Sequence, residues 1–310
     1  MLNQVSTQFD VIIVGGGVAG LSTALWCDEL GLSALLLEKD AQPGGQLLRI
    51  YNEIKNYLGR EAGNGRELLD VFLGQIEKRR FEVSLRAEIV EIDLEKKEIK
   101  LADNAKFSAP TIVIATGIRR RKLNVEGENE FRGKGIIESG KQNADAAKDK
   151  KVLIVGGGDA AFENALILAE TAEKVTLVHR RKDFRARREF VEQVKTHSRI
   201  EMLSETSVQK ILGNERIESI ELKNLINNET QILPIDVLLI RIGVEPNTET
   251  FRGQMELDKD GYIVVDRSCQ TSIKGIFAVG DVANPLAPTI SSAAGMGATA
   301  AKTIFSLLNS

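Results

Sequence analysis

Two glycine-rich turns constrain the fold of this 310-residue chain more than any other feature. The first reads GGGVAG at residues 15–20, and the second reads GGGDAA at residues 156–161. A strand-like apolar run precedes each turn, and apolar residues at helical spacing follow it. A strand, glycine turn and helix in this order typically bind the phosphates of a dinucleotide at the helix N-terminus. The pattern predicts an α/β chain with two Rossmann-like dinucleotide-binding units.

Each glycine of these turns has a separate task. The first permits a tight turn, the second lets the backbone approach a pyrophosphate, and the third position lets the helix pack closely on the strand. The alternative is an ordinary βαβ unit whose glycines serve packing alone. The predicted phosphate-binding residues are Gly15, Gly17, Ala19 and Gly20 in the first turn, and Gly156, Gly158, Asp159, Ala160 and Ala161 in the second.

The residue that ends the second strand differs between the two units and distinguishes the cofactors that they are expected to bind. Glu38 follows Gly15 by 23 positions, where a carboxylate can accept hydrogen bonds from ribose hydroxyls. His179 follows Gly156 by the same distance, and three arginines come next in the chain: Arg180, Arg181 and Arg185. A carboxylate repels a ribose 2′-phosphate, whereas a guanidinium can pair with it bidentately. The second unit is therefore expected to prefer NADPH over NADH.

The same basic segment has two other interpretations, a solvated helix face and a nucleic-acid patch. Arg187 and Arg188 are expected to be solvated. The net charge of −3 does not favour nucleic acid as a partner. His179 and His197 are the only histidines, and neither is expected to act as a catalytic acid; His179 is a candidate contact to the ribose phosphate.

Composition narrows the class of protein further. The length of 310 residues allows two ordinary domains, and a content of 43% hydrophobic and 27% charged residues is typical of a globular protein. No apolar run reaches the roughly 18 residues of a membrane span, and the start MLNQVSTQFD lacks the regions of a signal peptide. A cytoplasmic protein without a membrane partner is expected. Cys27 and Cys269 lie in apolar surroundings and are expected to be buried and inert, and no metal site is predicted.

Four further stretches identify the family that the chain resembles. They are PGGQL at 43–47, TIVIATG at 111–117, TSIKGIFAVGDV at 271–282 and PTISSAAGMGATAAKTIF at 288–305. With VHRRKDFR at 178–185 between them, their order resembles the thioredoxin-reductase-like flavoproteins over nearly the whole chain. The resemblance implies two three-layer domains, with the NADPH-binding domain (118–244) inserted into a discontinuous FAD-binding domain (1–117 and 245–310). It also implies a homodimer, and hinges in the crossing strands near Gly117 and Gly243.

The resemblance places FAD on the first turn, with its adenosine ribose on Glu38. The last helix would face the flavin with its N-terminus. No catalytic side chain is expected, because the chemistry belongs to the cofactors. The further FAD contacts that the resemblance implies are Lys39, Gly45, Gln46, Leu47, Tyr51, Ala115, Thr116, Gly117, Gly280, Asp281, Thr289 and Ile290.

One departure from the family bears on the electron path. Thioredoxin reductases carry a C-x-x-C pair just before the second glycine turn, and those two places fall on Ser139 and Gln142 here. A hydroxyl and an amide cannot cycle between dithiol and disulfide. We therefore expect reduced FAD to pass its electrons directly to an external acceptor.

A second departure is Tyr51, five residues after Gln46. Ferredoxin-NADP reductases of the thioredoxin-reductase-like type look similar there, with a tyrosine that stacks on the flavin; the alternative is an ordinary aromatic near a turn. Those enzymes commonly carry a C-terminal extension over the flavin, whereas this chain stops at Ser310. The leading hypothesis is an NADPH-dependent FAD reductase serving ferredoxin or flavodoxin. The alternatives are a thioredoxin-reductase-like enzyme that reduces a small or protein disulfide, and a flavin-binding sensor or other non-catalytic protein.

Overall fold

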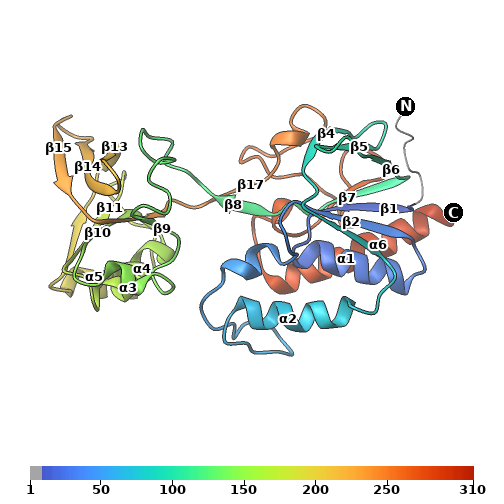
Figure 1. Ribbon diagram of the computed structural model, residues 1–310, viewed down its shortest axis with the longest axis horizontal. Helices are drawn as coiled ribbons and strands as arrows, with labels where there is room; N and C mark the ends of the chain where they lie inside the picture. The colour runs from blue at the N-terminus through green and yellow to red at the C-terminus, as the bar shows by residue number, and fades with distance from the viewer. Residues whose placement is uncertain (1–8) are drawn as a thin grey trace. The chain divides into compact units, whose positions relative to one another are not determined.

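The computed structural model describes residues 9–310 and divides the chain into two compact units. Unit 1 comprises the chain up to Arg119 together with Glu245–Ser310, and unit 2 comprises Arg120–Val244 (Figure 1). Unit 1 thus extends two residues beyond the expected boundary at 117. The physical reason is that Ile118 and Arg119 hydrogen-bond to other residues of unit 1.

A five-stranded parallel sheet forms the centre of unit 1, in the order β18-β7-β1-β2-β3. All four residues of the central strand β1 are buried, as expected for a β-branched run with both faces covered. The strands are β1 (Val11–Val14), β2 (Ala34–Glu38), β3 (Glu82–Leu85), β7 (Thr111–Ile114) and β18 (Ile276–Ala278).

Unit 1 has three layers, and alternate residues of β1 face the two outer layers. Val11 and Ile13 pack against one face, which the helices α1, α2 and α6 cover, whereas Ile12 and Val14 pack against a second, antiparallel sheet (Figure 1). This alternation follows from the two-residue period of a strand. The helices are α1 (Val18–Glu29), α2 (Gly65–Ile76) and α6 (Ile290–Leu308), and the second sheet consists of β4 (Ile89–Asp93), β5 (Glu98–Leu101) and β6 (Lys106–Ser108).

Unit 2 repeats this three-layer plan. Its parallel sheet has the order β12-β11-β10-β16-β9. Helices α3, α4 and α5 cover one face of this sheet, and the antiparallel sheet β13-β14-β15 covers the other. The strands of the parallel sheet are β9 (Ile136–Ile137), β10 (Lys151–Gly156), β11 (Lys174–Val178), β12 (Ile200–Leu203) and β16 (Val237–Arg241). The other elements are α3 (Ala144–Ala147), α4 (Asp159–Ala169), α5 (Arg188–Thr196), β13 (Thr206–Gly213), β14 (Ile217–Asn224) and β15 (Thr230–Pro234).

The two crossings of the chain between the units pair as a short two-stranded sheet of β8 (Ile118–Arg120) and β17 (Val244–Pro246). Three 3-10 turns complete unit 1: η1 (Gly45–Arg49), η2 (Glu249–Phe251) and η3 (Gly280–Val282). The predicted α/β architecture, with two Rossmann-like three-layer domains, is confirmed. Within residues 9–310, none of the helices has the length and apolar character that spanning a bilayer requires. The same residues form no group of three or more His, Cys, Asp or Glu side chains suited to a metal ion.

Candidate functional site

The first glycine turn joins β1 to α1, and two of its glycines are required by packing. Gly15 has a φ of +109°, and a Cβ there would lie 2.5 Å from the carbonyl oxygen of Ala115. A Cβ on Gly20 would lie 1.9 Å from the carbonyl oxygen of Gly15. A Cβ on Gly17, in contrast, would have only the Gly45 Cα within 4 Å, at 3.9 Å. Gly17 is also the N-cap of α1 and supplies no side chain to the first N–H groups, so the turn fits a pyrophosphate at this helix end.

Glu38 ends β2 beside this turn. Its carboxylate is buried and accepts hydrogen bonds from the backbone N–H groups of Gly16 (2.7 Å) and Asp40 (2.8 Å). Each carboxylate oxygen has a second lone pair, which a ribose hydroxyl can use. Lys39, the next residue, is exposed.

The PGGQL loop lies against the first turn. Gly44 donates its N–H to the carbonyl oxygen of Gly16 (2.8 Å), and Leu47 is buried in the core of unit 1. Gln46 donates from Nε2 to the carbonyl oxygen of Ile118 in β8 (2.7 Å). This bond joins the loop predicted to contact the flavin to a strand that connects the two units. Tyr51 follows η1 and is half-buried.

The strand β7 leads into a polar cluster that the sequence analysis did not identify. Ala115 is buried, and Thr116 donates from Oγ1 to the carbonyl oxygen of Asn247 (2.9 Å). Asn247 donates from Nδ2 to the Thr116 carbonyl (2.7 Å) and from its backbone to the Gly117 carbonyl (3.0 Å). Arg119 donates to the Asn247 side chain (3.0 Å) and pairs with Glu245 (2.8 Å) and with Glu249. Gly117, expected to be a hinge, therefore has its carbonyl fixed within unit 1.

The GD motif and the last helix complete the surroundings of the first turn. Gly280 has a φ of +74°, and a Cβ there would lie 2.7 Å from the Cβ of Ala19 in α1. Burial raises the pKa of the Asp281 carboxyl. Thr289 caps α6 by accepting a hydrogen bond from the N–H of Ser292 (3.2 Å), and Ile290 begins the helix. The structure thus brings β1, the PGGQL loop, β7 and the GD motif together around one helix N-terminus.

The second glycine turn joins β10 to α4 and has the same division of roles. A Cβ on Gly156 would lie 2.3 Å from the Arg241 carbonyl oxygen and 2.9 Å from the Cβ of Ala161, which is fully buried. A Cβ on Gly158 would meet nothing within 4 Å. Gly158 is the N-cap of α4 and provides no side-chain cap to the N–H groups of Asp159 and Ala160 that follow it. This turn also fits a pyrophosphate at a helix N-terminus.

His179 packs on the second turn. A Cβ added to Gly157 would lie 2.5 Å from the imidazole, and the ring of Phe184 lies 5.4 Å away between centroids. Burial lowers the pKa of His179, and the neighbouring charges of Arg181, Arg180 and Arg185 lower it as well, against an opposing hydrogen bond to the Asp183 backbone. The pKa of His179 thus lies below its ordinary value, which favours the neutral ring.

The three arginines predicted to bind the 2′-phosphate are all exposed. Within residues 9–310, Arg180, Arg181 and Arg185 form no ion pair with an acidic side chain. Arg187 differs, because it pairs with Asp159 and with Glu189. The unpaired guanidinium groups thus fit a phosphate ligand.

Comparison with known proteins decides the family. Residues 9–298 match the model of the pyridine nucleotide-disulphide oxidoreductase family. The chain belongs to this family. It is 34% identical over 299 residues to a thioredoxin reductase of Mycolicibacterium smegmatis, covering 95% of this chain and 94% of that one. It is 34% identical to a thioredoxin reductase of Helicobacter pylori, covering 97% of this chain and 99% of the relative.

Solved structures of thioredoxin reductases have the same fold as this chain. The crystal structure of Lactococcus lactis thioredoxin reductase in its FR conformation has a TM-score of 0.84 and 31% identity, covering 97% of this chain and 99% of that one. The structure of T. acidophilum thioredoxin reductase has a TM-score of 0.80 and 29% identity, with the same coverage. The family members use FAD and NADPH, and this chain is an oxidoreductase of the same kind. Both glycine turns fit these cofactors.

The segment that the resemblance aligns with the dithiol of thioredoxin reductases is a hydrogen-bonded turn in this chain. Ser139 accepts at Oγ from the N–H of Gln142 (3.4 Å) and at its carbonyl from the N–H of Asn143 (3.0 Å). Gly140 donates its N–H to the side chain of Asn164 in α4 (2.8 Å). These local hydrogen bonds stabilise the turn, and no cysteine takes part in it.

Both cysteines of the chain are free and buried in unit 1. Burial, with a smaller contribution from Asp10, raises the pKa of the Cys27 thiol to about 12. Burial, with a smaller contribution from Asp266, raises the pKa of the Cys269 thiol to about 11. Because the thiolate is the reactive form, neither thiol is suited to redox exchange at neutral pH.

Proposed function

We propose that this protein is an NADPH-dependent FAD oxidoreductase that passes electrons to an external acceptor without a dithiol of its own, and that this acceptor is a disulfide. The observation that carries the proposal is the pair of open glycine turns in a chain whose two cysteines are buried and 242 positions apart. A disulfide is the preferred acceptor because the relatives named above are thioredoxin reductases.

The residues around the first turn would hold FAD, and those around the second would hold NADPH. Gly17 and Gly158 leave room for the pyrophosphates, Glu38 would accept from the adenosine ribose, and the unpaired arginines would bind the 2′-phosphate. FAD, when bound, supplies two-electron chemistry between NADPH and the acceptor. The other contacts to FAD and NADPH would come from the remaining residues that the sequence predicts for each cofactor.

A second candidate keeps ferredoxin or flavodoxin as the acceptor. Tyr51 favours it, because this half-buried aromatic directly follows the loop predicted to contact the flavin. The comparisons, however, give no support to this acceptor, and the relatives named above favour the disulfide. We also propose a homodimer, as the resemblance implies.

An anaerobic reductive titration of the FAD-loaded protein tests the electron path without knowledge of the acceptor. Two electrons per flavin are expected, because FAD would be the only redox centre; an uptake of four would reveal a dithiol and contradict the proposal. Steady-state NADPH oxidation with 5,5′-dithiobis(2-nitrobenzoate), oxidised thioredoxin, ferredoxin and flavodoxin then identifies the acceptor. Turnover with ferredoxin or flavodoxin alone would select the second candidate, and negligible rates with all four would favour a non-catalytic protein.

A further inference from the structure

Asp159, the first residue of α4, holds a distant segment of unit 2. Its Oδ1 accepts a hydrogen bond from the backbone N–H of Arg187 (2.7 Å), and its Oδ2 accepts from the Nε of the same residue (3.0 Å). Beside it, the carbonyl oxygen of Gly157 accepts from the N–H groups of Arg185 (2.7 Å) and Ala186 (3.1 Å). Four hydrogen bonds therefore tie residues 185–187 to the second glycine turn.

These bonds order the loop that connects β11 to α5, which carries the three unpaired arginines. The start of the loop is held by His179, whose ring packs on Gly157. Its end is held by Arg187, whose guanidinium also pairs with Glu189 (2.9 Å) and lies 4.5 Å from the ring centroid of Phe190. Arg187 thus has three protein partners, while Arg180, Arg181 and Arg185 remain free for a ligand.

Asp159 places a negative charge beside the predicted phosphate site. A carboxylate beside a phosphate site weakens phosphate binding by Coulomb repulsion. Asp159 can favour binding only through another effect, and the two hydrogen bonds that it accepts from Arg187 offer one. A loop that is already ordered loses less conformational freedom when a ligand binds.

We propose that Asp159 and Arg187 are positioning residues that determine specificity for the 2′-phosphate of NADPH, by fixing the loop that carries Arg180, Arg181 and Arg185. The inference rests on the proposed placement of NADPH on the second turn. Neither the Asp159 carboxylate nor the Arg187 guanidinium need touch the ligand. They act instead by fixing the positions of the three arginines that bind the 2′-phosphate.

Isothermal titration of the FAD-loaded protein with adenosine 2′,5′-bisphosphate, and with 5′-AMP as the ligand that lacks the 2′-phosphate, tests this role. Asp159→Ala removes a negative charge, so electrostatics alone would tighten bisphosphate binding. Loss of the ordered loop instead weakens it, and we expect a Kd about three- to tenfold higher, as for the loss of one to two hydrogen-bonded contacts. The Kd for 5′-AMP should change less than about twofold.

Arg187→Gln removes the bond from Nε but keeps the backbone bond to Asp159, so it should raise the Kd in the same direction by a smaller factor. The double variant should lose no more than Asp159→Ala alone, because that substitution already breaks both bonds. Arg188→Gln is the matched control, since it removes a positive charge at the next position without breaking the pair with Asp159. Thermal melting checks that each variant is folded. If Asp159→Ala does not fold, the binding measurements on Arg187→Gln test the inference in its place.

Two results would overturn the inference. One is unchanged or tighter bisphosphate binding by the folded variants, and the other is an equal loss of bisphosphate and 5′-AMP affinity, which would mean general damage to the glycine turn. If the wild-type protein fails to prefer the bisphosphate over 5′-AMP, the placement of NADPH fails instead. The two failures are therefore distinguishable.

Discussion

At the scale of single residues, the glycines of the two turns fall into two groups, one required for folding and the other expected to serve cofactor binding. Gly17 and Gly158 have φ values of −73° and −106°, which alanine adopts freely, and a Cβ at either position meets no atom closer than 3.9 Å. Their small size is unnecessary for the fold of the chain itself. It is explained by the close approach of a pyrophosphate to the backbone.

We predict that Gly17→Ala and Gly158→Ala fold, with melting temperatures within a few degrees of the wild type when all three proteins are compared free of cofactors, because a bound cofactor itself raises the melting temperature. Gly17→Ala should lose FAD, measured as the flavin-to-protein absorbance ratio after purification. Gly158→Ala should keep FAD and raise the KM for NADPH at least about tenfold. Gly20→Ala is the control for packing, because its Cβ would lie 1.9 Å from the Gly15 carbonyl, and it should destabilise the fold. Undiminished cofactor binding by both Gly17→Ala and Gly158→Ala would contradict the role of these two glycines in pyrophosphate binding.

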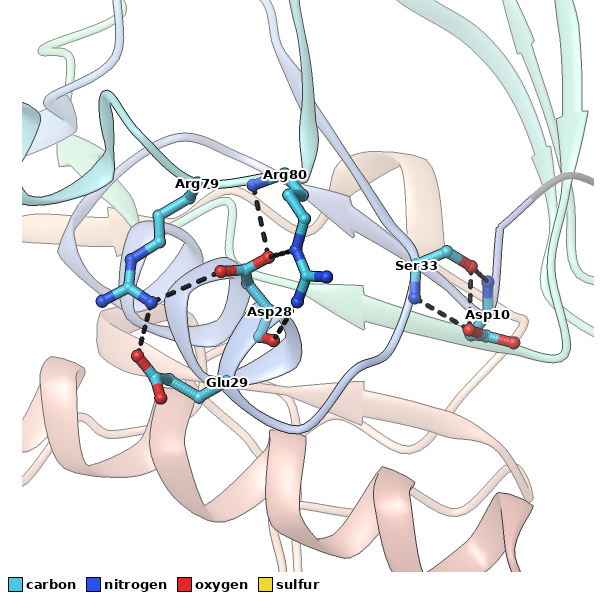
Figure 2. A network of polar contacts seen from close by, with 6 residues as sticks. All are labelled: Asp10, Asp28, Glu29, Ser33, Arg79 and Arg80. Carbon is cyan, nitrogen blue, oxygen red and sulfur yellow. Dashed lines mark hydrogen bonds and ion pairs between the residues drawn. The ribbon is translucent and has the colours of Figure 1, made fainter.

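At the scale of elements, an acidic residue ties the end of α1 to the segment after α2 (Figure 2). Asp28 is 8% exposed and accepts from the backbone N–H (3.2 Å) and Nε (3.1 Å) of Arg80 and from Arg79 (3.4 Å). Arg79 also pairs with Glu29. A carboxylate near the C-terminus of a helix is unfavourable for the helix dipole, so these arginines offset both the dipole and the burial.

The pKa of Asp28 gives this network a pH dependence. Burial raises the pKa, but the hydrogen bonds from Arg80 and Arg79 together outweigh it, and the folded-state pKa lies below the ordinary value. A lowered folded pKa means that the stabilisation is present above the unfolded pKa, near 4, and is lost as the pH falls through the folded pKa. Urea unfolding should show that Asp28→Asn costs about 2 kcal/mol at pH 7 and progressively less as the pH falls below about 4. The exposed Glu29→Gln should cost less than about 1 kcal/mol; an equal cost for both would refute the role of Asp28.

The elements also show what the sequence could and could not predict. The strands and helices around both turns were predictable because β-branched runs, glycines and helical spacing act locally, and Ala161 is buried as its packing role requires. Contacts between Asp159 and Arg187, 28 positions apart, and between Gln46 and Ile118, 72 positions apart, depend on tertiary proximity. No spacing rule identifies such pairs. The roles of the individual cofactor-binding residues stay predictions.

At the scale of the whole molecule, the number of redox centres decides the route of the electrons. The turn at residues 139–143 is closed by a hydrogen bond from the Asn143 N–H to the Ser139 carbonyl (3.0 Å), the spacing that is also found in a helical turn, and positions 139 and 142 both lie within it. The corresponding Cα separation is about 5 Å, which is within the range that a disulfide requires. The backbone is therefore suited to a dithiol that the side chains do not provide.

We predict that Ser139→Cys with Gln142→Cys creates a second redox centre. Anaerobic reductive titration with NADPH should then take up four electrons per flavin, against two for the wild type, because a dithiol would form at the positions that the resemblance assigns to it. Ser139→Cys alone is the control and should keep an uptake of two, since a single thiol cannot form the intramolecular disulfide. A double variant whose disulfide is confirmed by mass spectrometry, yet stays oxidised while the flavin is reduced, would contradict the assignment of these positions. An uptake of four would support the assignment of positions 139 and 142 to the dithiol site that the resemblance implies.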